Sequence, residues 1–570
     1  MERLIRLRED GVRGWLRAGS TQKRSTRRWQ TWSLWLLFLS AGLLAQTLHA
    51  AVPVKQADAV CAECHAEIFQ KYLNTPMANA SGLAMDHLIP GNFISATSGT
   101  KYRVHAEDGT AWLDYDDPQT PPAKGRMKLD YFLGSGHLGI TYLYTLDKYL
   151  LESPVAYYAS ANGYDMKPGF GGLREMPPAI PMEANCLRCH MSGVRHSDVG
   201  SVNHYSQEPF LYGGITCESC HGDTKAHVLS AGKAAVINPA KLDADRRDSI
   251  CMSCHLEGDV SVEKEGRSPV DFKPGESISR YLSYFVYASA GATARGVSEV
   301  EQFNTSMCKR ASGSKMSCTN CHDPHYTPPA AERAVFYRAK CLACHNQPAF
   351  VREHHPENQD CTSCHMPRSR AENIPHVAWT DHRILRQPMM NLADANPIHS
   401  DTLMPIFSPS TTQRDTALAY YAAAMEGHSG DRERAYAMLT AAHQSDPDDV
   451  EVMRSLGIFA GMSGDSQLAG SLFRNVLKLS PTDQTAASDL AVFEAKTGDL
   501  QCALTLLQPA FNRNQDSLGL ATNLAAVECL LGDGEAARST IETALKFNPG
   551  SRELTNRLQQ TSSCVATHTK

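Results

Sequence analysis

Seven copies of one five-residue pattern, Cys-x-x-Cys-His, occur in this sequence and use fourteen of its eighteen cysteines. Two thiols at this spacing add across the two vinyl groups of one porphyrin, and the next histidine then ligates the iron. The pattern therefore predicts seven covalently bound haem c groups. The predicted attachment cysteines are Cys61, Cys64, Cys186, Cys189, Cys217, Cys220, Cys251, Cys254, Cys318, Cys321, Cys341, Cys344, Cys361 and Cys364. The predicted proximal ligands are His65, His190, His221, His255, His322, His345 and His365.

Two other uses of cysteine pairs fit this pattern less well. Structural zinc sites need Cys-x-x-Cys units in pairs and have no use for a histidine directly after each second cysteine. A thioredoxin-like dithiol needs one such pair in an α/β context, and not seven.

The first fifty residues have the pattern of a targeting segment. A basic region ends in KRSTRRW (23–29), and the apolar run SLWLLFLSAGLLA (33–45) and small residues follow it. Such a run is short for a membrane span, so the pattern favours a cleaved secretory signal over 1–50, with an uncleaved anchor as the alternative. Export agrees with haem c, which bacteria attach outside the inner membrane, so we expect a periplasmic or extracellular protein.

Removal of this segment makes the chain more acidic. The first fifty residues hold nine of the 55 basic and three of the 61 acidic residues, so the net charge changes from −6 to −12. This balance argues against nucleic acid or anionic lipid as a partner and favours basic redox partners. Membrane contact is expected only if the signal is not cleaved.

The motifs divide the chain. The first stands apart, within 51–180, where 101–117 alternates around an Asp108-Gly109 turn and 131–159 is rich in β-branched and aromatic residues. These features predict a small β-meander packed against the first haem. The other six motifs fall within 181–391, which predicts a loop-rich, haem-cored domain with short helices. A Pro/Ser/Thr-rich stretch, 392–415, is typical of a linker.

The last part of the chain repeats every 34 residues. Gly-Asp pairs begin at Gly430, Gly464, Gly498 and Gly532, and Ala435, Ala469, Ala503 and Ala537 keep the same period. This period resembles the tetratricopeptide repeat, so we expect an all-α superhelix over 416–560, followed by a tail at 561–570. Such a surface binds proteins, which predicts docking of a redox partner or of a second copy.

Histidines outside the motifs are candidates for the second axial ligand of each iron. His227, six residues after His221, is too close in sequence to reach across its own porphyrin, so we expect it to ligate a neighbouring haem. His325 repeats this pattern after His322. Such crossed ligation would join adjacent haems into one rigid unit.

CESCHGDTKAH, SCTNCHDPH and CTSCHMPRSRAENIPHVAWTDHRI (361–384) resemble the multihaem cytochromes c related to the tetrahaem cytochrome of ammonia oxidation. They especially resemble the branch with C-terminal tetratricopeptide repeats, over roughly 58–560. The resemblance implies electron transfer through haems with mostly two axial ligands. The distal ligands then expected are His227, His325, His376 and His382, followed by His355 (or its neighbour His354) and His137. His87, His105, His196 and His204 are reserves.

The first haem departs from this family pattern. Many relatives have a histidine about twelve residues after the first proximal histidine, and Met77 stands there in this chain. Methionine is an axial ligand that raises the haem potential, and it is also a flexible apolar filler. If Met77 does not ligate and no reserve histidine replaces it, the first haem has an open coordination site.

Four cysteines lie outside the motifs. Cys308 is expected to be a packed or solvent-facing thiol, Cys502 and Cys529 are expected to be small apolar fillers between repeat helices, and Cys564 lies in the tail.

The function favoured by these patterns is an exported heptahaem electron carrier with a repeat domain for protein docking. The alternative is a multihaem reductase or oxidase of a small nitrogen or sulfur compound, which would need one open iron. No Cys-x-x-Cys-Lys motif occurs, and the candidate distal histidines outnumber the haems, so the sequence favours a non-catalytic carrier. An assembly protein in which the haems only hold the fold is a third hypothesis, and six motifs in about two hundred residues argue against it.

Overall fold

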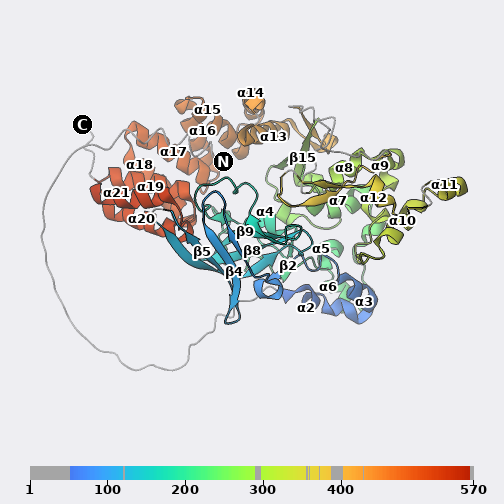
Figure 1. Ribbon diagram of the computed structural model, residues 1–570. Coiled ribbons are helices and arrows are strands. Elements are labelled where there is room, and N and C mark those ends of the chain that lie inside the picture. Colours follow the sequence, from blue (N-terminus) through green and yellow to red (C-terminus); the bar gives the residue numbers. More distant parts are fainter. Residues whose placement is uncertain are drawn as a thin grey trace.

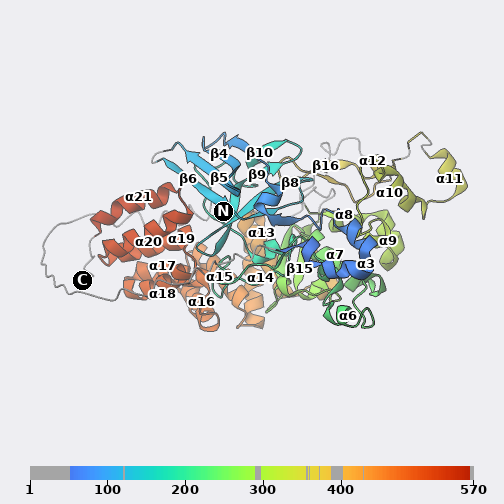
Figure 2. The same cartoon turned by 90° about the horizontal axis from the view of Figure 1, so that it is seen from below.

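The computed structural model describes residues 52–119, 122–288, 297–354, 357–358, 360–371, 373–386, 402–427 and 429–564. The predicted signal segment therefore lies outside the described residues. A β-rich part lies beside the segment that carries six of the motifs, and the helices α13–α21 run along both (Figure 1). In both views α21 and α11 lie at opposite ends of the molecule (Figure 2).

The first motif lies in a helix at the edge of the β-rich part. Short strand β1 (Val52–Pro53) leads into α2 (Val54–Ala57) and α3 (Ala59–Tyr72), which contains the motif. β1 pairs in parallel with β13 (Tyr212–Gly213), and β13 pairs with β12 (Met191–Ser192). These pairings fix the first motif beside the second and third.

The β-rich part consists of two antiparallel sheets. The first has the order β3-β4-β5-β6 and comprises β3 (Gly91–Ile94), β4 (Lys101–Glu107), β5 (Thr110–Asp117) and β6 (Ala123–Leu129). The second has the order β10-β9-β8-β7-β2, with β11 also on β9. It comprises β2 (Ser81–Leu83), β7 (Tyr131–Leu133), β8 (Gly139–Leu146), β9 (Tyr149–Tyr158), β10 (Gly163–Met166) and β11 (Ile180–Pro181).

The predicted hairpin is confirmed, and the sheet region is larger than the predicted meander. Asp108 and Gly109 have φ of 49° and 72°, the left-handed pair that a tight two-residue turn needs, and β4 pairs with β5 on either side. Buried Tyr102, Leu113 and Tyr142 pack the two sheets against each other. The extent of this core depends on strands far apart in sequence, and the local alternation does not reveal it.

Short helices and strands dominate the six-motif segment, as predicted. The helices are α4 (Ala184–Leu187), α5 (Glu218–His221), α6 (Lys225–Leu229), α7 (Ala244–His255), α8 (Glu299–Thr305), α9 (Met307–Ser312), α10 (Arg333–Leu342), α11 (Pro348–Glu353) and α12 (Cys361–His365). The strands are β14 (Val260–Glu263), β15 (Leu282–Tyr287), β16 (Arg368–Arg370) and β17 (Ala378–Thr380). Helices α5, α6, α9, α10 and α12 bury no side chain among the described residues. Such helices are not held by an apolar core of protein side chains.

The C-terminal part is an array of helical hairpins with the predicted period. It comprises α13 (Gln413–Glu426), α14 (Arg432–Ser445), α15 (Val450–Met462), α16 (Ser466–Leu479), α17 (Gln484–Thr497), α18 (Leu500–Arg513), α19 (Leu518–Leu530), α20 (Gly534–Phe547) and α21 (Arg552–Gln560).

The repeated Gly-Asp pairs explain where these helices begin and end. Gly464, Gly498 and Gly532 have φ between 85° and 95°, and each stops a helix. The aspartate that follows caps the next helix, as when the Asp465 carboxylate accepts from the Leu468 amide. The repeated alanines, such as Ala503, are buried where two helices cross.

Two findings differ from what composition indicated at the ends of the repeats. The described part of the predicted linker, 402–415, is folded: β18 (Leu403–Pro405) pairs with β15, and α13 begins before residue 416. Cys529 and Cys564 form a disulfide, so Cys529 is not a simple apolar filler and the tail is tied to the last repeat. A pairing between residues on a helix and in a tail has no local sequence signature.

The repeat helices contact the six-motif segment and the β-rich part at two places. At the first, Lys264 Nζ lies 2.5 Å from Asp415 Oδ2, and both side chains are largely buried. At the second, Asn203 donates to Asp516 and the Ala179 amide donates to the Asn548 side chain.

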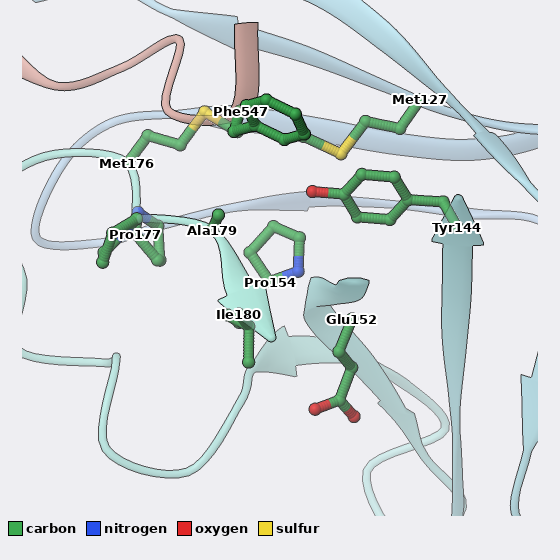
Figure 3. Close-up of a pocket in the computed structure, with 10 residues that line it drawn as sticks. Met127, Tyr144, Glu152, Pro154, Met176, Pro177, Ala179, Ile180 and Phe547 are labelled. Atoms are coloured by element: carbon green, nitrogen blue, oxygen red, sulfur yellow. The ribbon is translucent and has the colours of Figure 1, made fainter. Parts of the chain in front are cut away.

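The second contact has an apolar part as well. Phe547, at the end of α20, enters a small pocket of the β-rich part that Met127, Tyr144 and Met176 line (Figure 3). Loops between the repeats thus form a fixed contact with the rest of the chain.

Among the helices that the structure describes, none is both long and apolar enough to cross a membrane.

Candidate haem-ligand site

Each Cys-x-x-Cys-His motif lies on a helical turn. In α12, for example, the motif occupies the whole helix, in α5 it spans the N-cap residue Cys217 and the helix, and in α7 it forms the last turn. Residues three and four apart are neighbours on a helix surface, so the two thiols and the histidine of one motif face the same side. This is the arrangement that attachment of one porphyrin requires.

Four of the proximal histidines face a second histidine from elsewhere in the chain. The ring centres are 6.3 Å apart in His65–His227 and 6.0 Å apart in His221–His325. The planes within these two pairs are 13° and 16° apart, so the rings are nearly parallel.

The other two pairs have the same geometry. His322 faces His382 at 6.2 Å, and His365 faces His354 at 5.8 Å. Their planes are 29° and 24° apart. All four pairs thus share one narrow range of spacing.

This spacing fits one iron between two imidazoles. With metal–nitrogen bonds of about 2 Å on opposite sides of the metal, two imidazole centres lie about 6 Å apart. A direct hydrogen bond between two imidazoles would bring the centres to about 5 Å. The residues present therefore fit haem iron with two histidine ligands.

Backbone carbonyl groups orient four of these histidines. The Nδ1 atoms of His221, His227, His365 and His382 lie 2.7–2.8 Å from the carbonyl oxygens of Ile237, Ala234, Leu385 and Thr380. An Nδ1–H that donates to a carbonyl leaves the lone pair on Nε2, which is the atom that binds a metal. The carbonyls therefore select the tautomer that ligation needs.

Cysteines of different motifs also meet. Contact with Cys254 raises the pKa of Cys189, and contact with Cys318 raises the pKa of Cys251. The Cys61 and Cys217 sulfurs lie within 4.8 Å of each other and of an Asp58 oxygen. A cysteine joined to haem is a thioether and does not titrate, so these contacts matter because they show which motifs lie close together. Motif one adjoins motif three, motif two adjoins motif four, and motif four adjoins motif five.

Three proximal histidines have no histidine ring stacked opposite them in the part of the chain that the structure describes: His190, His255 and His345. His190 differs from the other two because it is half-buried, whereas His255 and His345 are exposed. Burial lowers the pKa of its imidazole to about 4, so it is neutral at pH 7. The ion pair Lys167–Glu152 lies near it, since Lys167 contributes to the same pKa shift.

Three predicted ligands that the structure describes are not brought to a proximal histidine, and a fourth is not described. Met77 packs in an apolar cluster with Val54 and Tyr72, and His137 is exposed. His376 Nε2 lies 2.7 Å from the Asp165 carboxylate. His355 lies outside the described residues.

The reserve histidines mostly contact carboxylates or aromatic rings. His105 and His196 lie 2.8 and 2.9 Å from Asp114 and Asp271 through Nε2, and His204 lies 2.7 Å from Asp198 through Nδ1. His87 packs edge-on against Phe132. These contacts give each reserve histidine a partner in the fold that does not involve an iron.

The sequence ranked His355 ahead of His354, yet His354 is the one that faces His365. The signal that could have found it is its position four residues after Phe350, on the same face of α11. The carbonyl partners of Nδ1 had no signal in the sequence, because backbone atoms are common to all residues.

Comparisons of the sequence find similarity to cytochromes. Residues 173–222 match the family described as cytochrome c554 and c-prime. The multiheme cytochrome MtrA of Shewanella baltica (strain OS185) is 24% identical over 216 residues, which are 35% of this chain and 57% of MtrA. The chain thus spans little more than half the length of this relative.

Solved structures resemble a part of about one quarter of the chain. The crystal structure of MamA is 20% identical, with a TM-score of 0.23, and the match covers 24% of this chain and 80% of that one. A thermophilic TPR protein of Thermus thermophilus is 18% identical, with a TM-score of 0.22, over 26% of this chain and 81% of that one. The two sequence matches support the class that the motifs indicate, a multihaem cytochrome with covalently bound haem c.

Proposed function

We propose that this protein is an exported heptahaem c-type cytochrome that passes electrons along a chain of haems, with its repeat domain serving protein docking. The observation that carries the proposal is the set of four histidine pairs with ring centres 5.8–6.3 Å apart. Haem c supplies reversible one-electron iron chemistry, and the protein supplies ligands, spacing and insulation from water.

In this proposal the distal ligands link motifs that are not adjacent in sequence. His227 follows the third motif and serves the first, His325 follows the fifth and serves the third, and His382 follows the seventh and serves the fifth. His354 precedes the seventh motif and serves it. Met77, His137 and His376 are then not needed for these four irons, and the relation to the cytochrome of ammonia oxidation stays a prediction.

Close packing of motifs favours exchange of electrons between haems. The cysteine contacts join motif one to three, two to four and four to five, so the attached groups would lie edge to edge. Burial and the Cys361 thiol also raise the pKa of Cys341 to about 11, which places motif six beside motif seven. These contacts join the motifs into three groups. Burial and the nearby Cys254 raise the pKa of Cys220, and burial and, among other groups, the nearby Cys344 raise the pKa of Cys321, so the third motif also lies near the fourth and the fifth near the sixth. A continuous chain through all seven motifs is consistent with these contacts.

Export and docking have independent support. The Cys529–Cys564 disulfide is typical of proteins that mature in an oxidising compartment such as the periplasm. The loops between the repeats contact the six-motif segment and the β-rich part. A redox partner or a second copy would therefore bind a different face of the repeat helices.

A second candidate function is reduction of a small nitrogen or sulfur compound at the second haem. It is favoured by half-buried His190, which faces no histidine in the described residues, and by the nearby pair of Lys167 and Glu152. An open iron needs such proton donors nearby.

Low-temperature EPR of the oxidised, haem-loaded protein tests both functions, together with a mass measurement of covalent haem. Seven haems and only low-spin signals that cyanide and nitric oxide leave unchanged are the result expected of a carrier. A high-spin signal that shifts with ligand in wild type and disappears in H190A would support the reductase instead. Protein without covalent haem would overturn both.

A further inference from the structure

Helix α11 places an aromatic ring between histidines of two motifs. The centre of the Phe350 ring lies 5.4 Å from that of His345 and 4.5 Å from that of His354, with planes 33° and 15° apart. His354 in turn faces His365. The four rings form a row from the sixth motif to the seventh, in the lobe at the opposite end from α21 (Figures 1 and 2).

The local sequence explains this row. Pro348 occupies the first turn of α11, and Phe350 and His354 are four residues apart, so they share a face of the helix. His354 is the last residue of this turn: its backbone is extended, with φ −85° and ψ 97°, and its amide donates to the Phe350 carbonyl at 2.9 Å.

We propose that Phe350 is a positioning residue, which holds the plane of the His354 imidazole so that it faces His365 across the iron of the seventh haem. This inference rests on the proposed haem function. Nearly parallel stacking at 4.5 Å fixes both the position and the rotation of the imidazole, whereas an aliphatic side chain fixes only its position.

The matched control is another phenylalanine of the same lobe. The Phe336 ring packs against Tyr326 and Tyr337, and among the described residues no histidine ring stacks on it. Substitution of Phe336 by leucine removes the same number of atoms near the same motifs. It therefore reports general loosening of the lobe.

The experiment uses the full haem-loaded chain and two readouts, covalent haem by mass and low-temperature EPR. We expect F350L and F350M to keep all haems while about one haem equivalent of low-spin signal shifts its g values or becomes high-spin. We expect F350Y and F336L to retain the wild-type spectrum, and H354A to lose the same signal that F350L alters.

Three results would overturn the proposal. They are an unchanged spectrum in both F350L and F350M, a shift in F336L equal to that in F350L, and an unchanged spectrum in H354A where H355A loses a low-spin signal. Wild-type protein without covalent haem or low-spin iron would instead refute the proposed function, which separates the two failures.

Discussion

His227 lies opposite His65, with ring centres 6.3 Å apart and planes 13° apart, although His65 belongs to the first motif and His227 follows the third. Imidazole rings at this distance make no hydrogen bond with each other. Their spacing has a physical explanation when one iron binds both. This pair therefore provides the most direct test of crossed ligation.

Replacement of His227 by alanine should convert the first haem from low-spin to high-spin. Cysteine attachment does not need the distal ligand, so we expect the covalent haem count to stay at the wild-type value. EPR and the visible spectrum measure the change, which should amount to about one haem equivalent. H105A is the control, because His105 contacts Asp114 and should leave the spectrum unchanged. An unaltered spectrum in H227A would assign the distal ligand to another residue, with Met77 the next to test.

Reductive titration should spread over several overlapping one-electron steps. Adjacent haems interact, since reduction of one changes the charge that its neighbour senses, and different surroundings give different potentials. Spectroelectrochemistry of the whole protein measures this directly. One sharp transition for all haems would contradict a chain of coupled centres.

Substitution D415N should loosen the repeats from the cytochrome segment. Asp415 completes the capping box of α13 with Thr412 and lies 2.5 Å from Lys264, so the variant leaves a largely buried ammonium without its counter-charge. We expect a loss of about 3 kcal/mol in the stability of the repeat helices, measured by thermal melting of the far-ultraviolet circular dichroism. The control E542Q breaks an exposed pair with Arg538 and should cost less than about 0.5 kcal/mol.

The same pair predicts a loss of stability in acid. Burial alone would raise the pKa of Asp415, but its hydrogen bonds with Lys264 and Thr412 outweigh burial and lower it below the ordinary value. A lowered folded-state pKa means that the stabilisation is complete above about pH 4, the unfolded value, and is lost as the pH falls through the folded value. Melts of wild type and D415N should therefore converge as the pH drops below about 4. Curves that remain parallel would show that Asp415 is not responsible.

Loss of the Cys529–Cys564 disulfide should destabilise the last repeat by about 3 kcal/mol, because the bond closes a long loop. C529S and C564S should behave alike, and each should expose one extra thiol to alkylation under denaturing conditions. C502S, which removes a free cysteine of the preceding repeat, is the matched control. Equal melting of C529S and wild type would show that the bond does not form in the mature protein.

Features with a local signature could be predicted from the sequence, and features that depend on distant contacts could not. Gly464, Gly498 and Gly532 each end one helix, and the aspartate after each glycine caps the next helix, so the 34-residue period in the sequence predicted where these helices meet. The linker prediction missed that Leu403 and its neighbours pair with β15, since a Pro/Ser/Thr-rich stretch carries no record of the strand it joins.

The candidate ligands show the same limit. His227, His325 and His382 meet proximal histidines, and each stands close to a motif in the sequence. His376 satisfies the same pattern, yet Asp165, from a strand more than two hundred residues earlier, occupies its Nε2. A histidine pattern reports which side chains are suitable, whereas the tertiary fold decides what each one meets.

Crossed ligation also constrains how such a molecule matures. The partner of His65 lies beyond the third motif, that of His221 lies beyond the fifth, and that of His322 lies beyond the seventh. A chain that crosses the membrane from its N-terminus would receive each of these haems before the second ligand has emerged. These irons would then gain their second ligand only after haem attachment, and the last of them only once residue 382 has crossed the membrane. A chain that stalls during translocation would therefore carry haems that are attached but still reactive.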